Sequence, residues 1–207
     1  MGRTKRFVAA AVGLLVASGI VSAQPEKAPQ GAMDPAKQAA MEAMQKYGSP
    51  SEAHKTLEAF AGTWNYTVQF RMSPEGSVQT MGGTATNTIV FGGRFIKQEF
   101  HGKPDGDQPP FEGFGFIGYD NIRKEYQSVW IDNMATGMMT GIGQFDTATK
   151  SLTEQGSFSC PITMETSRKF RAKWRIVDPY NTIYESYMSS PDGKEFKAME
   201  IHYNRAG

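Results

Sequence analysis

Apolar and polar side chains alternate along the chain after residue 62, with a repeat of two. Trp64, Tyr66, Val68, Phe70 and Met72 fall on one face, and the residues between them are polar. This repeat is typical of a β-strand that buries one face. Similar segments separated by Gly, Pro, Asp and Asn turns predict nine further strands. We expect them near residues 77–91, 94–101, 111–119, 125–132, 137–145, 151–158, 167–177, 182–189 and 194–204.

The connections between these ten predicted strands are short, and no helix falls between them. Parallel pairing needs crossovers of about a dozen residues or more, so the strands are expected to pair antiparallel. Closing such a sheet removes its two edges. The predicted fold class is therefore all-β, an up-and-down antiparallel barrel preceded by two helices. A barrel of more than about eight strands has room for a ligand cavity, whereas the rival two-sheet sandwich would be packed solid.

Two short helices are predicted before the first strand. Asp34 can cap the first helix with Pro35 at its first position, and Gly48 follows the last helical residue. Ser49 and Glu52 have the spacing of a capping box, which indicates the start of a second helix.

The N-terminus has the order of a secretory signal. Arg3, Lys5 and Arg6 precede an uncharged apolar run, and small residues lead up to Ala23. The run is too short to span a bilayer comfortably, so cleavage near Ala23 is favoured over an uncleaved anchor. We expect a periplasmic or secreted protein. The predicted organisation is a signal peptide over 1–23, a linker over 24–33, helices over 34–61 and a barrel domain over 62–205.

Net charge limits the classes of binding partner, and the cysteine content shows whether a disulfide can form. The chain has 22 Lys+Arg and 21 Asp+Glu, and removal of the three basic residues at the N-terminus leaves 19 against 21, a net charge of −2. This balance does not favour nucleic acid or an anionic membrane as partner. Cys160 is the only cysteine, so no internal disulfide forms, and a small buried apolar role is expected for it.

One stretch of the fifth predicted strand could line a cavity. Alternation places Tyr126, Trp130 and Asp132 on one face, where they would form a polar and aromatic patch able to orient a ligand. Tyr119 and Met138 are candidates to extend this site. Asp132 could instead cap the turn that begins after it. Asp120 is expected to stabilise a turn.

Gly62-Thr63-Trp64, a short helix followed by Gly-x-Trp at the first strand, resembles the calycins, which include lipocalins, fatty-acid-binding proteins and nitrobindin-like haem barrels. The resemblance implies that Gly62 and Trp64 close one end of the barrel. It also implies an Arg from a late strand over the Trp, for which Arg205 is the first candidate and Arg175 the second.

A wider set of motifs is similar to one bacterial family, the domain-of-unknown-function family 1579. The motifs are His54…Leu57…Gly62-Thr63-Trp64, Gly92-Gly93-Arg94-Phe95, Phe111-Glu112-Gly113, Gly118-Tyr119-Asp120 and Trp130-Ile131-Asp132. The likeness covers about residues 50–204. It implies no catalytic residues.

The three histidines do not form a metal motif. His54, His101 and His202 lack the spacing of a ligand pair. His202 lies late in the chain, as the haem-ligating His of nitrobindin-like barrels does, but the residues around it do not match. We therefore expect no metal and no cofactor, with haem as an alternative.

Three functions follow from these patterns. The first is a barrel that binds a small apolar or amphipathic molecule in its interior. The second is an enzyme that uses a cavity carboxylate such as Asp132 as general acid or base. The third is an envelope domain whose helices over 34–61 bind a partner protein.

Overall fold

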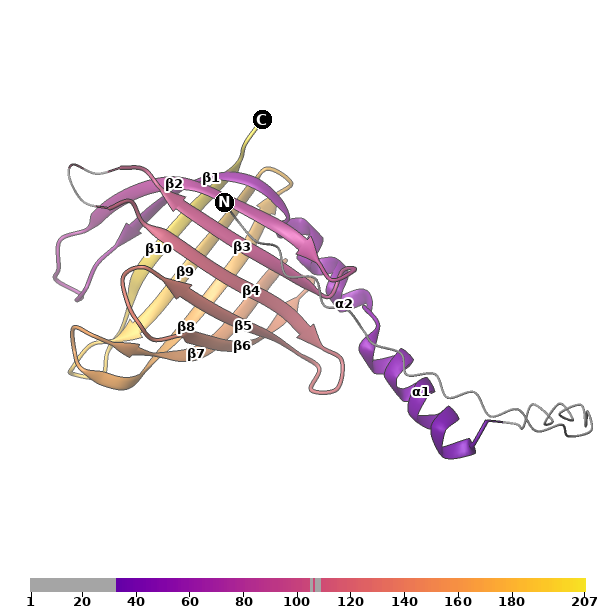
Figure 1. Ribbon diagram of the computed structural model, residues 1–207. Coiled ribbons are helices and arrows are strands. Elements are labelled where there is room, and N and C mark those ends of the chain that lie inside the picture. Colours follow the sequence, from indigo (N-terminus) through magenta and orange to yellow (C-terminus); the bar gives the residue numbers. More distant parts are fainter. Residues whose placement is uncertain (1–32, 105, 107–108) are drawn as a thin grey trace, which may run out of the picture.

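The computed structural model describes residues 33–104, 106 and 109–207, and ten strands dominate it (Figure 1). They are β1 (Gly62–Phe70), β2 (Gln79–Val90), β3 (Phe95–Gly102), β4 (Glu112–Asp120), β5 (Glu125–Asp132), β6 (Met139–Asp146), β7 (Ser151–Cys160), β8 (Glu165–Asp178), β9 (Asn181–Ser189) and β10 (Glu195–Arg205). Each predicted strand is found, and the ends differ from the prediction by only a few residues. The predicted signal peptide, and the predicted linker up to residue 32, lie outside the described residues.

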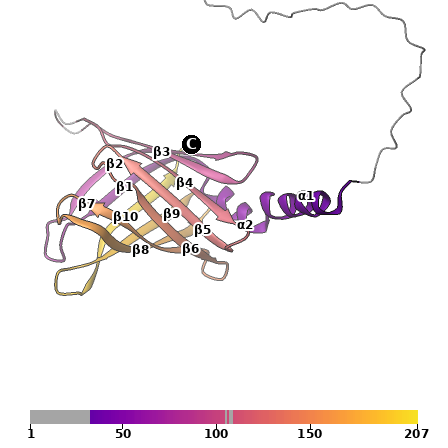
Figure 2. The ribbon, with the colours of Figure 1, turned by 60° about the horizontal axis from the view of Figure 1, so that its bottom comes forward.

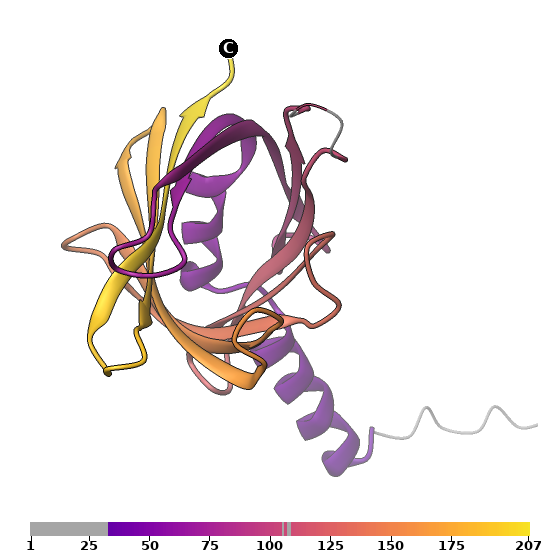
Figure 3. The same ribbon diagram turned by 90° about the vertical axis from the view of Figure 1, so that its left-hand side faces the viewer.

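The sheet closes into a barrel because β1 pairs with both β2 and β10. Strands β2 to β9 each pair antiparallel with their two neighbours in the sequence, and β10 pairs with β9 and β1. The closing register runs from Trp64 opposite Arg205 to Phe70 opposite Met199. Closure gives partners to the backbone groups that an open sheet would leave at its edges. The predicted up-and-down barrel is confirmed, and the two-sheet sandwich is excluded. Figure 3 looks along the barrel and shows the ring of strands.

The expectation of two separate helices is wrong. The residues before the barrel form one bent helical segment of 26 residues, in which α1 (Pro35–Gly48) is followed by the short α2 (Glu52–Lys55) and a 3-10 turn, η1 (Thr56–Phe60). Asp34 caps α1 as predicted, accepting a hydrogen bond of 3.0 Å from the Ala36 amide.

The capping box at the bend begins at Ser51 rather than Ser49. The Ser51 amide donates to Nδ1 of His54 at 2.9 Å, so a histidine takes the place predicted for Glu52. Among the described residues, no helix is long and apolar enough to cross a membrane.

The end of this segment covers one end of the barrel, and α1 points away from it (Figures 1 and 2). Leu57 and Phe60 of η1 are buried together with Trp64 at the start of β1. The Asn87 side chain donates to the Phe60 carbonyl at 2.9 Å. We call this the closed end, and we call the opposite end, which carries the β1–β2 and β5–β6 connections, the open end.

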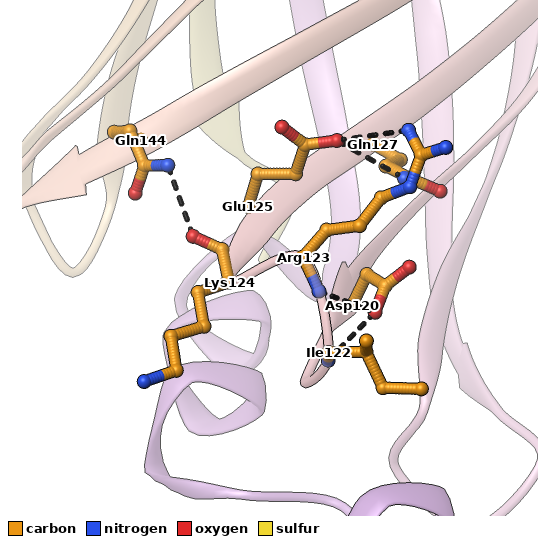
Figure 4. Close-up of polar contacts among 7 residues, drawn as sticks. All are labelled: Asp120, Ile122, Arg123, Lys124, Glu125, Gln127 and Gln144. Atoms are coloured by element: carbon orange, nitrogen blue, oxygen red, sulfur yellow. Dashed lines mark hydrogen bonds and ion pairs between the residues drawn. The ribbon is translucent and has the colours of Figure 1, made fainter.

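The hairpin between β4 and β5 ties the bend to the closed end. Figure 4 shows that Asp120 accepts hydrogen bonds from the amides of Arg123 and Ile122, at 3.0 and 2.8 Å, and these bonds lower the pKa of its carboxyl group. The turn role expected for Asp120 is confirmed. The neighbouring Asn121 side chain donates to the carbonyls of Tyr47 and Ser49, at 3.0 and 2.8 Å. Figure 4 also shows Gln144 of β6 bound to the backbone of this hairpin at Lys124.

Replacing Tyr126 with phenylalanine is expected to lower the free energy of unfolding by about 0.5–1.5 kcal/mol. Its hydroxyl donates to the Ala53 carbonyl at 2.7 Å and so joins β5 to the helical segment. Chemical denaturation measures the change. Tyr180→Phe is the matched control, because Tyr180 is 67% exposed. Equal effects at both positions would show that the bond to Ala53 contributes nothing.

Candidate functional site

Side chains directly opposite each other on antiparallel strands share a face, so the register separates inward from outward positions. Trp64 is paired with Ala85, Ala85 with Phe100, Phe100 with Gly113, and Gly113 with Asp132. Since Trp64 is in the core, all of this row faces the interior. The same pairing continues around the barrel.

The five residues predicted to form one ligand patch do not lie together. Tyr119 and Tyr126 pack against each other at the closed end, with ring centroids 4.9 Å apart. Trp130 and Asp132 lie further along β5, toward the open end, and Met138 is 66% exposed at the rim. Tyr126, Trp130 and Asp132 do share one face of β5, as alternation predicts, but a strand advances about 3.3 Å per residue. Residues four to six positions apart therefore reach different ends of the barrel.

Asp132 caps a turn, which is one of the two roles left open by the sequence, and it also holds a neighbouring indole. One carboxylate oxygen accepts a hydrogen bond of 2.9 Å from the Trp130 indole, and the other accepts one of 2.9 Å from the Met134 amide. The first contact fixes the indole, and the second caps the turn after β5. The carboxylate that the acid–base alternative needs is thus already engaged at the rim.

Gly62, Trp64 and Arg205 meet at the closed end. The Arg205 guanidinium lies 4.2 Å from the Trp64 ring centroid and donates to the Ala61 carbonyl at 2.8 Å. The Trp64 indole donates to the Phe60 carbonyl at 3.0 Å. Gly62 has a φ of 119°, and a Cβ there would collide with the guanidinium. Glycine is therefore required at this position by both conformation and space.

Large inward side chains lie flat against the wall where the neighbouring strand carries glycine. Trp130 covers Gly113 and Gly115, where an added Cβ would lie 2.2 and 2.8 Å from the indole. Phe170 likewise covers Gly156, at 2.7 Å from an added Cβ. These two rings therefore lie against the wall of the barrel.

Exposure of the inward side chains changes along the barrel axis. Near the closed end Trp64, Ile96 and Leu152 are at most 2% exposed. Toward the open end Trp130 and Phe158 are only partly buried, although both point inward. Other partly buried inward residues are Met139, Met188, Met199 and Ile201. Solvent therefore reaches the inner wall from the open end.

Glu154 of β7 is the central polar group of this wall, and the sequence interpretation missed it. It is paired with Ala172 and Gly143 and so points inward. Its Oε2 accepts a hydrogen bond of 3.0 Å from the Ser128 hydroxyl of β5. Burial raises the pKa of Glu154, and donation from Ser128 and the nearby Trp174 indole N–H, which stops short of a hydrogen bond, partly offset this effect. The Glu154 side chain is half-buried on the inner face of the barrel.

Three tyrosines continue the polar groups across the interior. Burial raises the pKa of Tyr184, and the nearby Glu154 carboxylate adds to the shift. Burial also raises the pKa values of Tyr203 and Tyr66. Trp174 contacts two of these tyrosines. Its ring centroid lies 4.5 Å from that of Tyr184 and 5.7 Å from that of Tyr203.

Five buried polar atoms have no hydrogen-bond partner among the described residues. They are Tyr66 Oη, Asn87 Oδ1, Gln98 Nε2, Trp174 Nε1 and Thr182 Oγ1. The strand register places all five side chains on the inner face. Buried polar groups almost always have a partner, so this concentration on one face requires a physical explanation.

The remaining candidates lie outside this interior. His202 and His101 are exposed on the outer face, and His202 contacts Glu200 at 2.6 Å. His54 is buried in the helical segment, and this burial lowers its pKa. Among the described residues, no group of three or more His, Cys, Asp or Glu side chains could hold a metal ion.

Cys160 is buried at the open end of β7, as expected. Its thiol lies 3.6 Å from Nη1 of Arg168. Burial opposes ionisation, but hydrogen bonds from Thr163, Ile162 and Arg168 outweigh it and lower the pKa to about 7. The thiol is therefore more acidic than an ordinary cysteine, although the sequence predicted only a small apolar role for it.

Two hollows lie on the surface of the protein, apart from the inner face of the barrel. One, of about 250 Å³, lies between the bend of the helical segment and the β2–β3 turn, and its lining includes His54, Ile89 and Gly93. The other, of about 210 Å³, lies at the rim beside Arg71 and Lys197. Neither contains Glu154 or any of the five unpartnered polar atoms.

The fold and its lining define a closed ten-stranded barrel covered at one end. Its fold is similar to that of Rv2717c from M. tuberculosis, with a TM-score of 0.56 and 15% identity over 77% of this chain and all of that one. Two designed proteins, a redesigned β-barrel and a de novo fluorescence-activating β-barrel, match at TM-scores of 0.38 and 0.37 with 14% and 19% identity. They cover 73% of this chain and 96% and 97% of their own.

The family can be stated directly. The model of the protein family of unknown function DUF1579 matches residues 49–205, and the chain belongs to that family. This confirms the family resemblance found in the sequence. No curated protein matches the chain.

Proposed function

We propose that the barrel is partly hollow and binds a small molecule with an apolar body and a polar group. The observation that carries this proposal is the set of five unpartnered polar atoms, all on the inner face. A buried group without a partner costs about 1–3 kcal/mol, so a solidly packed interior would be strongly disfavoured. A ligand or ordered water that reaches these atoms would remove that cost.

The lining supports an amphipathic rather than a polar ligand. Trp130 and Phe170 lie flat along the wall, and Phe100 packs against Trp130 with ring centroids 5.0 Å apart. Apolar pockets with a few well-placed polar groups are the usual form of small-molecule sites. Glu154 and Ser128 supply such groups in the middle of this lining.

We propose further that the barrel is of the calycin type. Gly62 and Trp64 at the start of β1, with Arg205 over the indole, support this assignment. The fold match to Rv2717c is consistent with it but shows only the barrel architecture.

The partner-docking alternative keeps one supporting observation. No residue of α1 is buried, and Met41, Met44 and Tyr47 are 52%, 75% and 44% exposed. This is the unpartnered apolar surface that the alternative requires.

Binding can be tested with the neutral fluorescent probe N-phenyl-1-naphthylamine. Met139 faces the lumen beside Trp130, whereas Thr140 faces outward. We expect the probe to bind the unmodified protein, and Met139→Trp to weaken binding by about tenfold, or 1.4 kcal/mol, because the larger indole occupies the lumen. Thr140→Trp adds the same indole outside and should leave binding unchanged. Failure of the probe to bind, or equal binding by both variants, would contradict an interior site.

Export is proposed on the order of basic, apolar and small residues over positions 1–23. N-terminal sequencing of the protein recovered from the cells that produce it should begin at Gln24. A protein recovered only with its original N-terminus would contradict cleavage.

A further inference from the structure

Among the residues that the structure describes, Glu154 has no counter-ion within the barrel. The other charged side chains at inward positions are Asp132 and Arg168 at the open end and Arg205 at the closed end. Each of them is engaged locally: Asp132 by Trp130, Arg168 by the Ser189 carbonyl and Arg205 by Trp64. A buried carboxylate without an opposite charge is strongly disfavoured. Either the group stays neutral, or a positive charge comes from outside the chain.

The polar groups nearest to Glu154 direct donors toward its carboxyl group, which favours its charged form. The Ser128 hydroxyl donates to Oε2, and the Trp174 indole N–H is directed toward the same carboxyl group, although it does not reach hydrogen-bond geometry. Among the described residues, Oε1 accepts no hydrogen bond, so one oxygen is left for a donor from outside.

An inorganic cation does not fit this place. Hard cations such as Ca²⁺ take about six to eight oxygen ligands, and Glu154 and Ser128 offer only two side chains. No larger group of metal-ligating side chains occurs in the described part of the chain. The surrounding wall is aromatic instead. A Cβ built on Gly141 would lie 2.7 Å from Ser128 Oγ, 3.3 Å from Glu154 Oε2 and 3.5 Å from the tip of Phe170. The carboxylate and an aromatic ring thus lie next to each other over Gly141.

We propose that the interior takes an organic amine, whose ammonium group pairs with Glu154 while its apolar body lies along the aromatic wall. The inference rests on the proposed interior binding site and specifies its ligand class. An ammonium donates to the free Oε1 and supplies the missing charge, and aromatic faces attract cations. Trp174 and Tyr184, which pack against each other beside the carboxylate, and Phe170 provide such rings.

The test uses three probes with one aromatic body: 2-(1-naphthyl)ethylamine, its N-acetyl amide and 3-(1-naphthyl)propionic acid. Binding is followed by quenching of tryptophan fluorescence at neutral pH, since Trp130 and Trp174 face the lumen. We expect the amine to bind about tenfold or more tighter than the amide and the acid. Glu154→Gln keeps the shape of the side chain and removes its charge, so it should abolish this preference and leave the amide unaffected. Glu99→Gln is the matched control, because Glu99 faces outward and pairs with Lys97 at 2.7 Å.

The outcomes separate the inference from the proposed function. If N-phenyl-1-naphthylamine binds but the amine binds no better than the amide, or if Glu154→Gln leaves amine binding unchanged, the amine inference is overturned and the interior site stands. If Glu154→Gln weakens the amine and the amide equally, the charge of Glu154 is not the determinant, and the inference is again overturned. If neither N-phenyl-1-naphthylamine nor any of the three probes binds, both proposals fail.

Discussion

Replacing Trp64 with alanine is expected to lower the free energy of unfolding by about 3–5 kcal/mol, as large-to-small changes at buried aromatic positions do. Trp64 is 2% exposed and holds three parts of the closed end together. Its indole donates to Phe60, its face is covered by Arg205, and its backbone belongs to the β1–β10 pair that closes the barrel. Alanine would leave a cavity and remove both contacts. Urea denaturation followed by circular dichroism measures the loss.

Two further variants show how much of this loss comes from the indole of Trp64. Trp64→Phe keeps an aromatic ring and should cost less than alanine, because only the indole N–H and part of the volume are lost. Ile122→Ala is the surface control, since Ile122 is 73% exposed, and should change stability by no more than about 0.5 kcal/mol. A Trp64→Ala protein as stable as this control would contradict the closing role of the indole.

The second large effect is a gain of stability at neutral and alkaline pH from Glu154→Gln. The folded-state pKa of Glu154 is raised by burial, so the folded protein holds this proton at pH values where the unfolded chain has already released it. Stability therefore falls as pH rises from the unfolded value, about 4.3, through the raised folded value. Glutamine carries no charge and avoids this loss. We expect the variant to be more stable by about 1–3 kcal/mol at high pH, the cost of an unsatisfied buried group.

The pH dependence of the difference is the decisive readout. Thermal unfolding of the two proteins should coincide in acid, where Glu154 is protonated in both the folded and unfolded states, and diverge as pH rises. Carboxyl groups with lowered pKa values, such as Asp146 and Asp178, titrate in both proteins and cancel in the comparison. A difference that is constant with pH, or a less stable variant at high pH, would show that Glu154 is not an unpaired acid. A residue that reduces stability in this way fits a role in binding.

The barrel could be predicted because its signals are local. Alternation in β1 and the turn residues between strands determine the number of strands, and short connections determine antiparallel order. The sequence did not reveal that the helical residues form one bent segment. Ser49 and Glu52 have the spacing of a capping box and so indicated a new helix, whereas in the structure Ser51 and His54 form the capping box.

The candidate site was harder to predict because it depends on pairing between distant strands. Leu152, Glu154 and Phe158 alternate within a predicted strand, and two apolar residues on this face already indicated that Glu154 points inward. The partners of Glu154 could not be read in the same way, since Ser128 is 26 residues away and is brought beside it only by the register of β5, β6 and β7. The patch predicted on β5 was too large because the prediction considered only which face of the strand each residue occupies. It did not consider that Tyr126 and Asp132 lie near opposite ends of that strand.

A crystal structure of the protein with bound 2-(1-naphthyl)ethylamine tests the central claim most directly. We expect the naphthyl ring inside the open half of the barrel, along Phe170, and the amine within hydrogen-bond distance of the Glu154 carboxylate. A complex in which the lumen is filled by the protein's own side chains and the amine lies only on the outer surface would contradict the account.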